Sequence, residues 1–122
     1  MTDRADEMME HAGHQIAHIY SGLASACAAL PLPITLPTGV VTSEEIIPAV
    51  RRIVEIIEEV PLPEDQQADL FAVATYWLAA VDLYGINVHE FEESRVAGVM
   101  GILLMAGETL GQLAEWLLND RD

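Results

Sequence analysis

Residues 91–118 read FEESRVAGVMGILLMAGETLGQLAEWLL, and this stretch decides the fold. Placed on a helix, its apolar side chains cover two adjoining sectors and leave only a narrow polar strip. Such a helix is either central in its own domain or buried against another chain. A helix of a four-helix bundle is normally half exposed, so we expect this one to contact its own domain with one sector and a second copy of the chain with the other.

The two sectors contain different residues. The first, expected to face the domain core, consists of Val99, Leu103, Ala106, Leu110, Ala114 and Leu117. The second, expected to form a dimer interface, consists of Phe91, Gly98, Ile102, Met105 and Trp116. The polar strip consists of Glu90, Ser94, Glu108, Gln112 and Glu115.

Proline and glycine residues divide the rest of the chain into three further helical segments. We expect helices over about 3–30, from residue 42 or 43 to just before the Pro-rich turn VPLPED at 60–65, and over about 63–84. The last helix is expected to run from residue 87 to about 118, which would make it longer than its partners. The sequence therefore predicts an all-α, four-helix bundle formed by residues 1–122 as one domain.

Capping residues set the expected boundaries of these helices. Thr42 followed by Glu45 has the spacing of a capping box at the start of the second helix. Gly85 is expected to end the third helix in a left-handed conformation, and Asn87 is expected to cap the fourth. Residues 30–42 carry three prolines and a glycine, so we expect an extended connection that covers a bundle end or reaches a non-adjacent helix.

Charge limits the partners more tightly than any motif does. The chain has 20 acidic residues against five basic ones, all arginine, which gives a formal net charge of -15. Such a surface repels nucleic acid backbones and anionic lipid, and it favours basic protein surfaces or cations. We therefore expect a basic protein partner and no direct binding of nucleic acid or membrane.

The remaining composition indicates a cytoplasmic protein. Cys27 is the single cysteine, so no internal disulfide is available, and the N-terminal residues are too acidic to open a secretory signal. The charge-free runs 70–81 and 96–107 are each about half of what a bilayer span requires.

An acidic patch is the first candidate site. Its carboxylates lie on both sides of the turn between the second and third helices, and they are Glu55, Glu58, Glu59, Glu64, Asp65 and Asp69. A patch of this kind is either a docking site for a basic partner or a solubilising surface.

A stripe of imidazoles is the second candidate site. Glu7, His11, His14 and His18 follow one another at spacings of four, three and four, which places them on one face of the first helix. Imidazole and carboxylate ligands suit a divalent transition metal. The alternative is a solvated polar face, because one helix rarely supplies a whole metal site.

No catalytic constellation is present in the sequence. Cys27 lies on the apolar stripe of the first helix, and no Gly-rich phosphate loop or nucleophile elbow occurs. The sequence therefore favours a non-catalytic interaction module, such as an inhibitor, an immunity-type neutraliser, a chaperone or an assembly adaptor. A metal-binding helical bundle and a DNA-mimic inhibitor are the alternatives.

Overall fold

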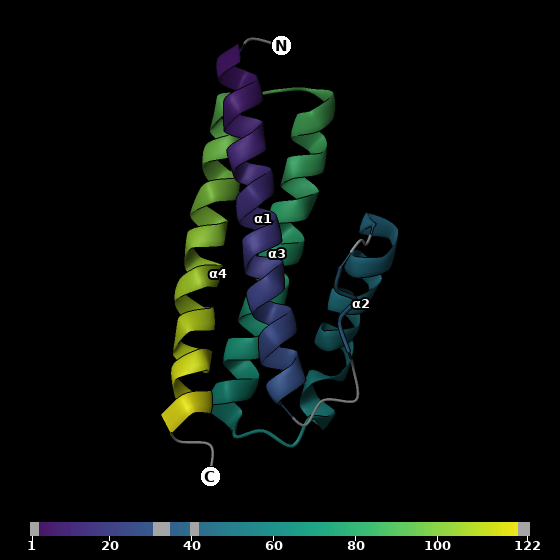
Figure 1. The fold of residues 1–122 in the computed structure, drawn as a ribbon, viewed down its shortest axis with the longest axis vertical. Coiled ribbons are helices and arrows are strands. Elements are labelled where there is room, and N and C mark those ends of the chain that lie inside the picture. The colour runs from purple at the N-terminus through teal and green to yellow at the C-terminus, as the bar shows by residue number, and fades with distance from the viewer. Residues whose placement is uncertain (1–2, 31–34, 40–41, 120–122) are drawn as a thin grey trace.

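The computed structural model of the chain describes residues 3–30, 35–39 and 42–119 (Figure 1). Its elements, in chain order, are α1 (Asp3–Ala29), α2 (Ser43–Ile56), the 3-10 turn η1 (Ile57–Glu59), α3 (Glu64–His89) and α4 (Glu93–Asn119). No strand occurs among the described residues, so the predicted all-α fold with four helices is confirmed. The C-terminal helix has 27 residues, the same number as α1, and is therefore not longer than all of its partners.

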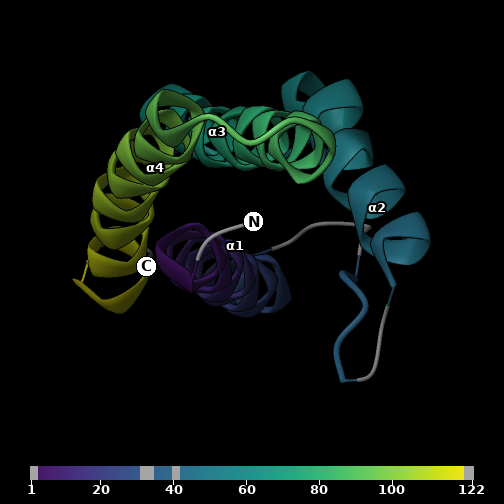
Figure 2. The same ribbon diagram turned by 90° about the horizontal axis from the view of Figure 1, so that it is seen from above.

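The helices lie side by side, but they do not all contact one another. Seen from above, α4, α3 and α2 follow an arc, and α1 lies on its concave side (Figure 2). α1 packs against α3 and α4, whereas no Cα atom of α1 comes within 8 Å of one in α2. α2 packs instead against α3 and the η1 turn, and its Val50 and Ile53 are buried in the same core as residues of α1, α3 and α4.

The connections between helices explain this arrangement. Only residues 90–92 join α3 to α4, and a link this short makes consecutive helices antiparallel neighbours. Within the longer connection from α1 to α2, the described residues 35–39 lie beside α1, because the Tyr20 hydroxyl donates a hydrogen bond of 2.6 Å to the Pro37 carbonyl oxygen and Leu36 is buried. α2 therefore runs in the same direction as α1 and α4, opposite to α3 (Figure 1).

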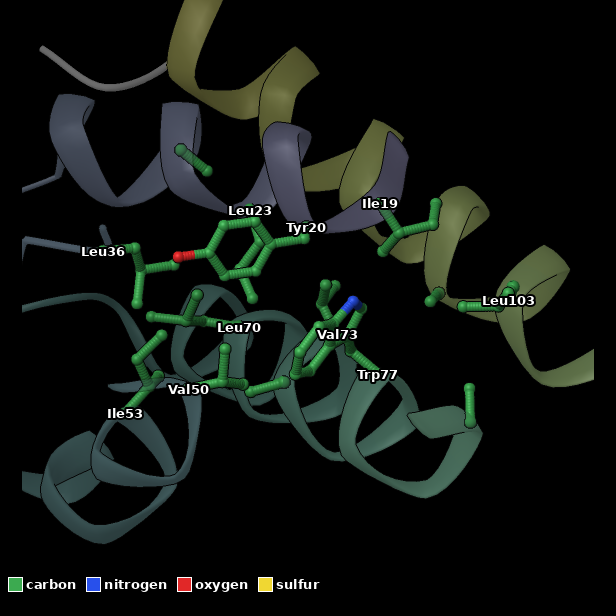
Figure 3. Packing of buried hydrophobic residues seen from close by; sticks show 14 of the residues in the cluster. Ile19, Tyr20, Leu23, Leu36, Val50, Ile53, Leu70, Val73, Trp77 and Leu103 are labelled. Atoms are coloured by element: carbon green, nitrogen blue, oxygen red, sulfur yellow. The ribbon is translucent and has the colours of Figure 1, made fainter. Parts of the chain in front are cut away.

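Trp77 of α3 lies at the centre of the core and is fully buried (Figure 3). Its indole N–H donates to the Ile16 carbonyl oxygen of α1 at 2.9 Å, and its ring lies 5.5 Å from that of Tyr20. Leu23 and Val73 pack into the same cluster and are also fully buried. α1 and α3 thus meet around one aromatic pair.

The predicted end of the third helix at Gly85 and the predicted start of the fourth at Asn87 are wrong. α3 continues through Gly85 to His89, and among the described residues only Gly39 has a positive φ. The buried Asn87 side chain explains the difference: its Oδ1 accepts the Glu92 N–H at 2.7 Å, and its amide nitrogen lies 3.2 Å from Met9 Sδ. Asn87 thus fixes the corner from within α3, and α4 begins six residues later.

The start of α2 also differs from the predicted capping box. Thr42 precedes the helix with extended backbone, as expected, but its hydroxyl makes no capping bond to the backbone. The hydroxyl lies instead 3.5 Å from the Glu45 carboxylate. Pro48 is accommodated within α2, and the helix is continuous around it.

α3 and α4 are each long and apolar enough, by length and composition alone, to cross a membrane. The core helices of globular proteins meet the same criterion, and two such helices are weak support for a membrane protein. The localisation of the chain stays a prediction.

Candidate functional site

The two apolar sectors of α4 have different surroundings. In the first sector, Val99, Leu103 and Ala106 are buried in the core, as expected, and Leu110 and Leu117 are half-buried against it. The expectation is wrong for Ala114, which is exposed. In the second, Phe91, Ile102 and Trp116 are half-buried and pack against the same core.

Two further members of the second sector differ in exposure. A Cβ at Gly98 would lie 3.2 Å from Leu83 Cδ2, so this glycine lets α3 approach closely. Met105 has 48% of its surface exposed. Most of the proposed dimer interface therefore has partners within its own chain, and dimerisation stays a prediction.

The structure separates the acidic patch into two parts. Glu55, Glu58, Glu59 and Glu64 are exposed around η1 and the start of α3. Asp65 and Asp69 instead line a hollow of about 440 Å³ between the first turns of α3 and the last turns of α4. We call all six carboxylates the acidic corner and this cavity the acidic hollow.

α4 contributes residues to the acidic hollow that the sequence alone did not assign to the patch. Glu115, Trp116 and Gln112 line its α4 side, and Gln66 and Ala68 complete the α3 side. Three carboxylates and one indole ring thus line the same hollow. The signal that was missed is the antiparallel pairing of the last two helices, which brings residues near 115 beside residues near 65.

The carboxylates of the acidic hollow are not neutralised within the described part of the chain. Burial, and to a smaller degree the neighbouring Asp65, raises the pKa of the Asp69 carboxyl above its ordinary value. Ion pairs among the described residues join Arg4 to Glu93 and Arg95 to Glu92, and both lie at the opposite end of the α3–α4 pair. The hollow therefore presents uncompensated negative charge.

The imidazole stripe lies on the outside of α1. Glu7, His11, His14 and His18 are all exposed. Across the described ranges, no three His, Cys, Asp or Glu side chains come together in a way that would hold a metal ion.

Cys27 has the properties of a core residue. Its side chain is 2% exposed, and burial raises the pKa of its thiol to about 12. A thiol that stays protonated at physiological pH is a poor nucleophile. Its place on the buried stripe of α1 agrees with the expectation from sequence.

A groove between α1 and α4 is the largest apolar feature bordering the imidazole stripe. It consists of two hollows of about 580 and 490 Å³, which share His18, Ile19 and Gly107. The sequence analysis did not predict this groove, because it requires knowing that α1 and α4 are neighbours. Comparison of the chain with protein-family models, with curated proteins and with solved structures found no match, so any function must be argued from these surfaces.

Proposed function

We propose that this chain is a non-catalytic protein-interaction module that pairs with a second copy of itself and binds a basic partner protein through the acidic corner. The observation that carries the second part is the acidic hollow, where Asp65, Asp69 and Glu115 lie beside Trp116 without a cation from the described residues. Inhibitors, immunity-type neutralisers, chaperones and assembly adaptors all act by binding of this kind.

The lining of the hollow suits an arginine or lysine side chain of the partner. Carboxylates accept hydrogen bonds from a guanidinium or ammonium group, and an indole face attracts the same cations. Gln66 and Gln112 supply amide oxygens that are additional acceptors. A cation placed there would oppose the rise in the pKa of Asp69, which comes mainly from burial and to a smaller degree from Asp65.

The exposed carboxylates around η1 have a different role in this proposal. Glu55, Glu58 and Glu59 are solvated, so each contributes little to the affinity of a bound complex. Together they attract a basic surface from a distance and accelerate association, and salt screens this attraction. Binding should therefore weaken as ionic strength rises.

A titration with nona-arginine tests the proposal, with tryptophan fluorescence as the readout. Trp116 lines the hollow, whereas Trp77 is fully buried in the core and should respond little. The double variant Asp65→Asn/Asp69→Asn should raise the Kd about 10-fold at 0.15 M salt, because two charge-assisted contacts are lost. Affinity should also fall as the pH is lowered through the raised pKa of Asp69, since the protonated carboxyl no longer attracts a cation.

A matched control separates the hollow from the overall charge. Asp6→Asn/Glu10→Gln removes the same number of charges from exposed positions of α1 and should change the Kd by less than about twofold. If both double variants weaken binding equally, the chain attracts cations through its net charge alone and the acidic hollow is not a binding site.

A further inference from the structure

α4 keeps an incompletely covered apolar face that shares only Ala114 with the predicted sectors. Leu104 and Leu118 are 65% and 84% exposed, the highest values among the exposed large apolar side chains of the described residues. Small or flexible residues continue the same face at alternating spacings of four and three. We call this face the outer seam, and it consists of Met100, Leu104, Gly107, Gly111, Ala114 and Leu118.

The spacing of the outer seam is that of a coiled-coil interface. Apolar residues that alternate at intervals of three and four repeat every seven residues and keep one line of a helix facing a partner helix. The seam extends over 18 residue steps, or about 27 Å at 1.5 Å per residue. The Gly107 and Gly111 pair at its centre lacks side chains, so another backbone can approach closely.

The outer seam forms one wall of the α1–α4 groove. All six of its residues line one or both of the two hollows, and the opposite wall includes the small residues Gly22, Ser25 and Ala29 of α1. The groove therefore extends along the whole length of the seam.

We propose that the outer seam is the surface that pairs with a second copy, with the two α4 helices parallel and each lying in the α1–α4 groove of the other. This inference rests on the self-pairing part of the proposed function and assigns it to a surface. The four helices of the pair, α1 and α4 from each copy, would then form a bundle around the two-fold axis.

Charge favours this face over the others for self-association. Each copy carries a formal net charge of -15, so two copies repel one another at most orientations. None of the six seam residues is charged, and the two hollows include a single carboxylate, Glu108. Contact along the seam thus buries apolar surface where the repulsion is weakest.

Geometry favours the parallel orientation. α1 and α4 run in the same direction, as the contacts between Arg4 and Glu93 and between Ile19 and Gly107 require. A two-fold axis parallel to the helices places α1 of the two copies on opposite sides, so each α4 can move into the other groove. An axis perpendicular to the helices places both α1 helices on the same side, and neither groove can be filled reciprocally.

Polar groups beside the seam support the same orientation. His18 lies at the α1 side of the groove where the two hollows meet, and Glu108 flanks the seam on its other side at nearly the same height. Parallel pairing brings the imidazole of His18 toward Glu108 of the second copy, a donor toward an acceptor. Antiparallel pairing would instead place both Glu108 carboxylates on the same side of the pair, away from the His18 imidazoles, which is less favourable.

The first experiment is sedimentation equilibrium of the full chain and two glycine variants. Gly111→Glu places a charged side chain at the centre of the seam, and the dimer Kd should rise at least 100-fold. A Cβ at Gly111 meets nothing within 4 Å, so the fold of one copy tolerates the change. Gly85→Glu is the matched control, because Gly85 is also an exposed helical glycine with open space, and it should leave the Kd unchanged.

Disulfide trapping tests the orientation in a Cys27→Ala background. In a parallel pair, Leu104→Cys and Leu118→Cys should each cross-link with themselves, since equal positions face one another along the axis. In an antiparallel pair, only a mixture of the two variants would cross-link. The second result would overturn the parallel arrangement.

Salt distinguishes failure of this inference from failure of the basic-partner proposal. Higher salt weakens binding of nona-arginine, but it should tighten the dimer by screening repulsion between the copies. A wild-type chain that stays monomeric at every protein and salt concentration would overturn both the seam and the self-pairing. The binding of nona-arginine is tested independently of this result. A dimer that Gly111→Glu does not weaken overturns the seam alone.

Discussion

The two sides of α1 differ in how completely they are packed. Toward α3 and α4, the Trp77 indole is bonded to the Ile16 carbonyl, and Leu110 lies directly over Gly22. Toward α2, a hollow of about 580 Å³ lies between α1 and Ile46. Thr38 and Gly39, next to the Pro37 that accepts the Tyr20 hydrogen bond, also line this hollow. One face of the helix is closed by interlocking side chains. On the other face, the hydrogen bond from Tyr20 to Pro37 holds residues 35–39 beside the hollow.

This difference follows from chain connection more than from hydrophobicity. α2 has the cleanest amphipathic pattern in the chain, yet its apolar face meets α3 and leaves α1 uncovered on that side. Because only residues 90–92 connect them, α3 and α4 pack against each other, and α1 packs against both. A strong apolar stripe thus specifies which side of a helix is buried. The connections between helices determine which neighbour covers that side.

Trp77→Ala should break the closed side and have the largest effect. It removes the largest fully buried side chain together with its hydrogen bond to Ile16, so the free energy of unfolding should fall by about 3–5 kcal/mol. Chemical denaturation followed by far-UV circular dichroism measures the loss. Phe71→Ala on the exposed side of the same helix is the control, with a change of about 0.5 kcal/mol or less. Equal effects would mean that Trp77 is not the centre of the core.

Gly22→Val should separate α1 from α4 with a smaller cost. The new Cβ would lie 2.5 Å from Leu110 Cδ2, so the leucine must move, and we expect a loss of about 1–3 kcal/mol. Adding Leu110→Ala should recover part of that loss in a double-mutant cycle. Gly85→Val, where a Cβ has open space, controls for the substitution itself. Strict additivity of the two changes would contradict the close contact.

Tyr20→Phe should loosen the open side and have the smallest effect. It removes the hydrogen bond to Pro37, which is expected to stabilise the chain by about 0.5–1.5 kcal/mol. Burial, with Cys27 and Glu45 nearby, raises the pKa of the Tyr20 phenol, so this donor keeps its proton at physiological pH. Hydrogen exchange of residues 35–39 should accelerate, whereas Tyr76→Phe should leave it unchanged. Unaltered exchange in both variants would show that Tyr20 does not hold this segment.

Periodicity predicted the helices and most of their buried faces. Ala12, Ile19 and Leu23 of α1 are buried as the sequence indicated, because spacing alone determines which side chains share a face. The corner at 85–93 was not predictable in this way. Asn87 resembles a helix cap in sequence, but its oxygen accepts the Glu92 N–H while its amide contacts Met9, a residue 78 positions away.

The candidate site was predictable in part. Asp65 and Asp69 were assigned to the acidic patch from their positions, but the same reasoning grouped them with Glu55, which the structure leaves exposed and outside the hollow. Glu115 and the outer seam required knowledge of which helices are neighbours. Sequence periodicity gives the direction of each side chain on its own helix and does not give the partner.

The partners of α1 also determine when it can fold. The contacts of Arg4, Met9 and Ile16 are with residues 61 to 89 positions later in the chain. At synthesis rates of about 5–20 residues per second, α1 leaves the ribosome roughly 3–18 s before these partners exist. Its apolar stripe is exposed to other nascent chains and to chaperones throughout that interval. Of the four described helices, the first in the chain is thus among the last to pack.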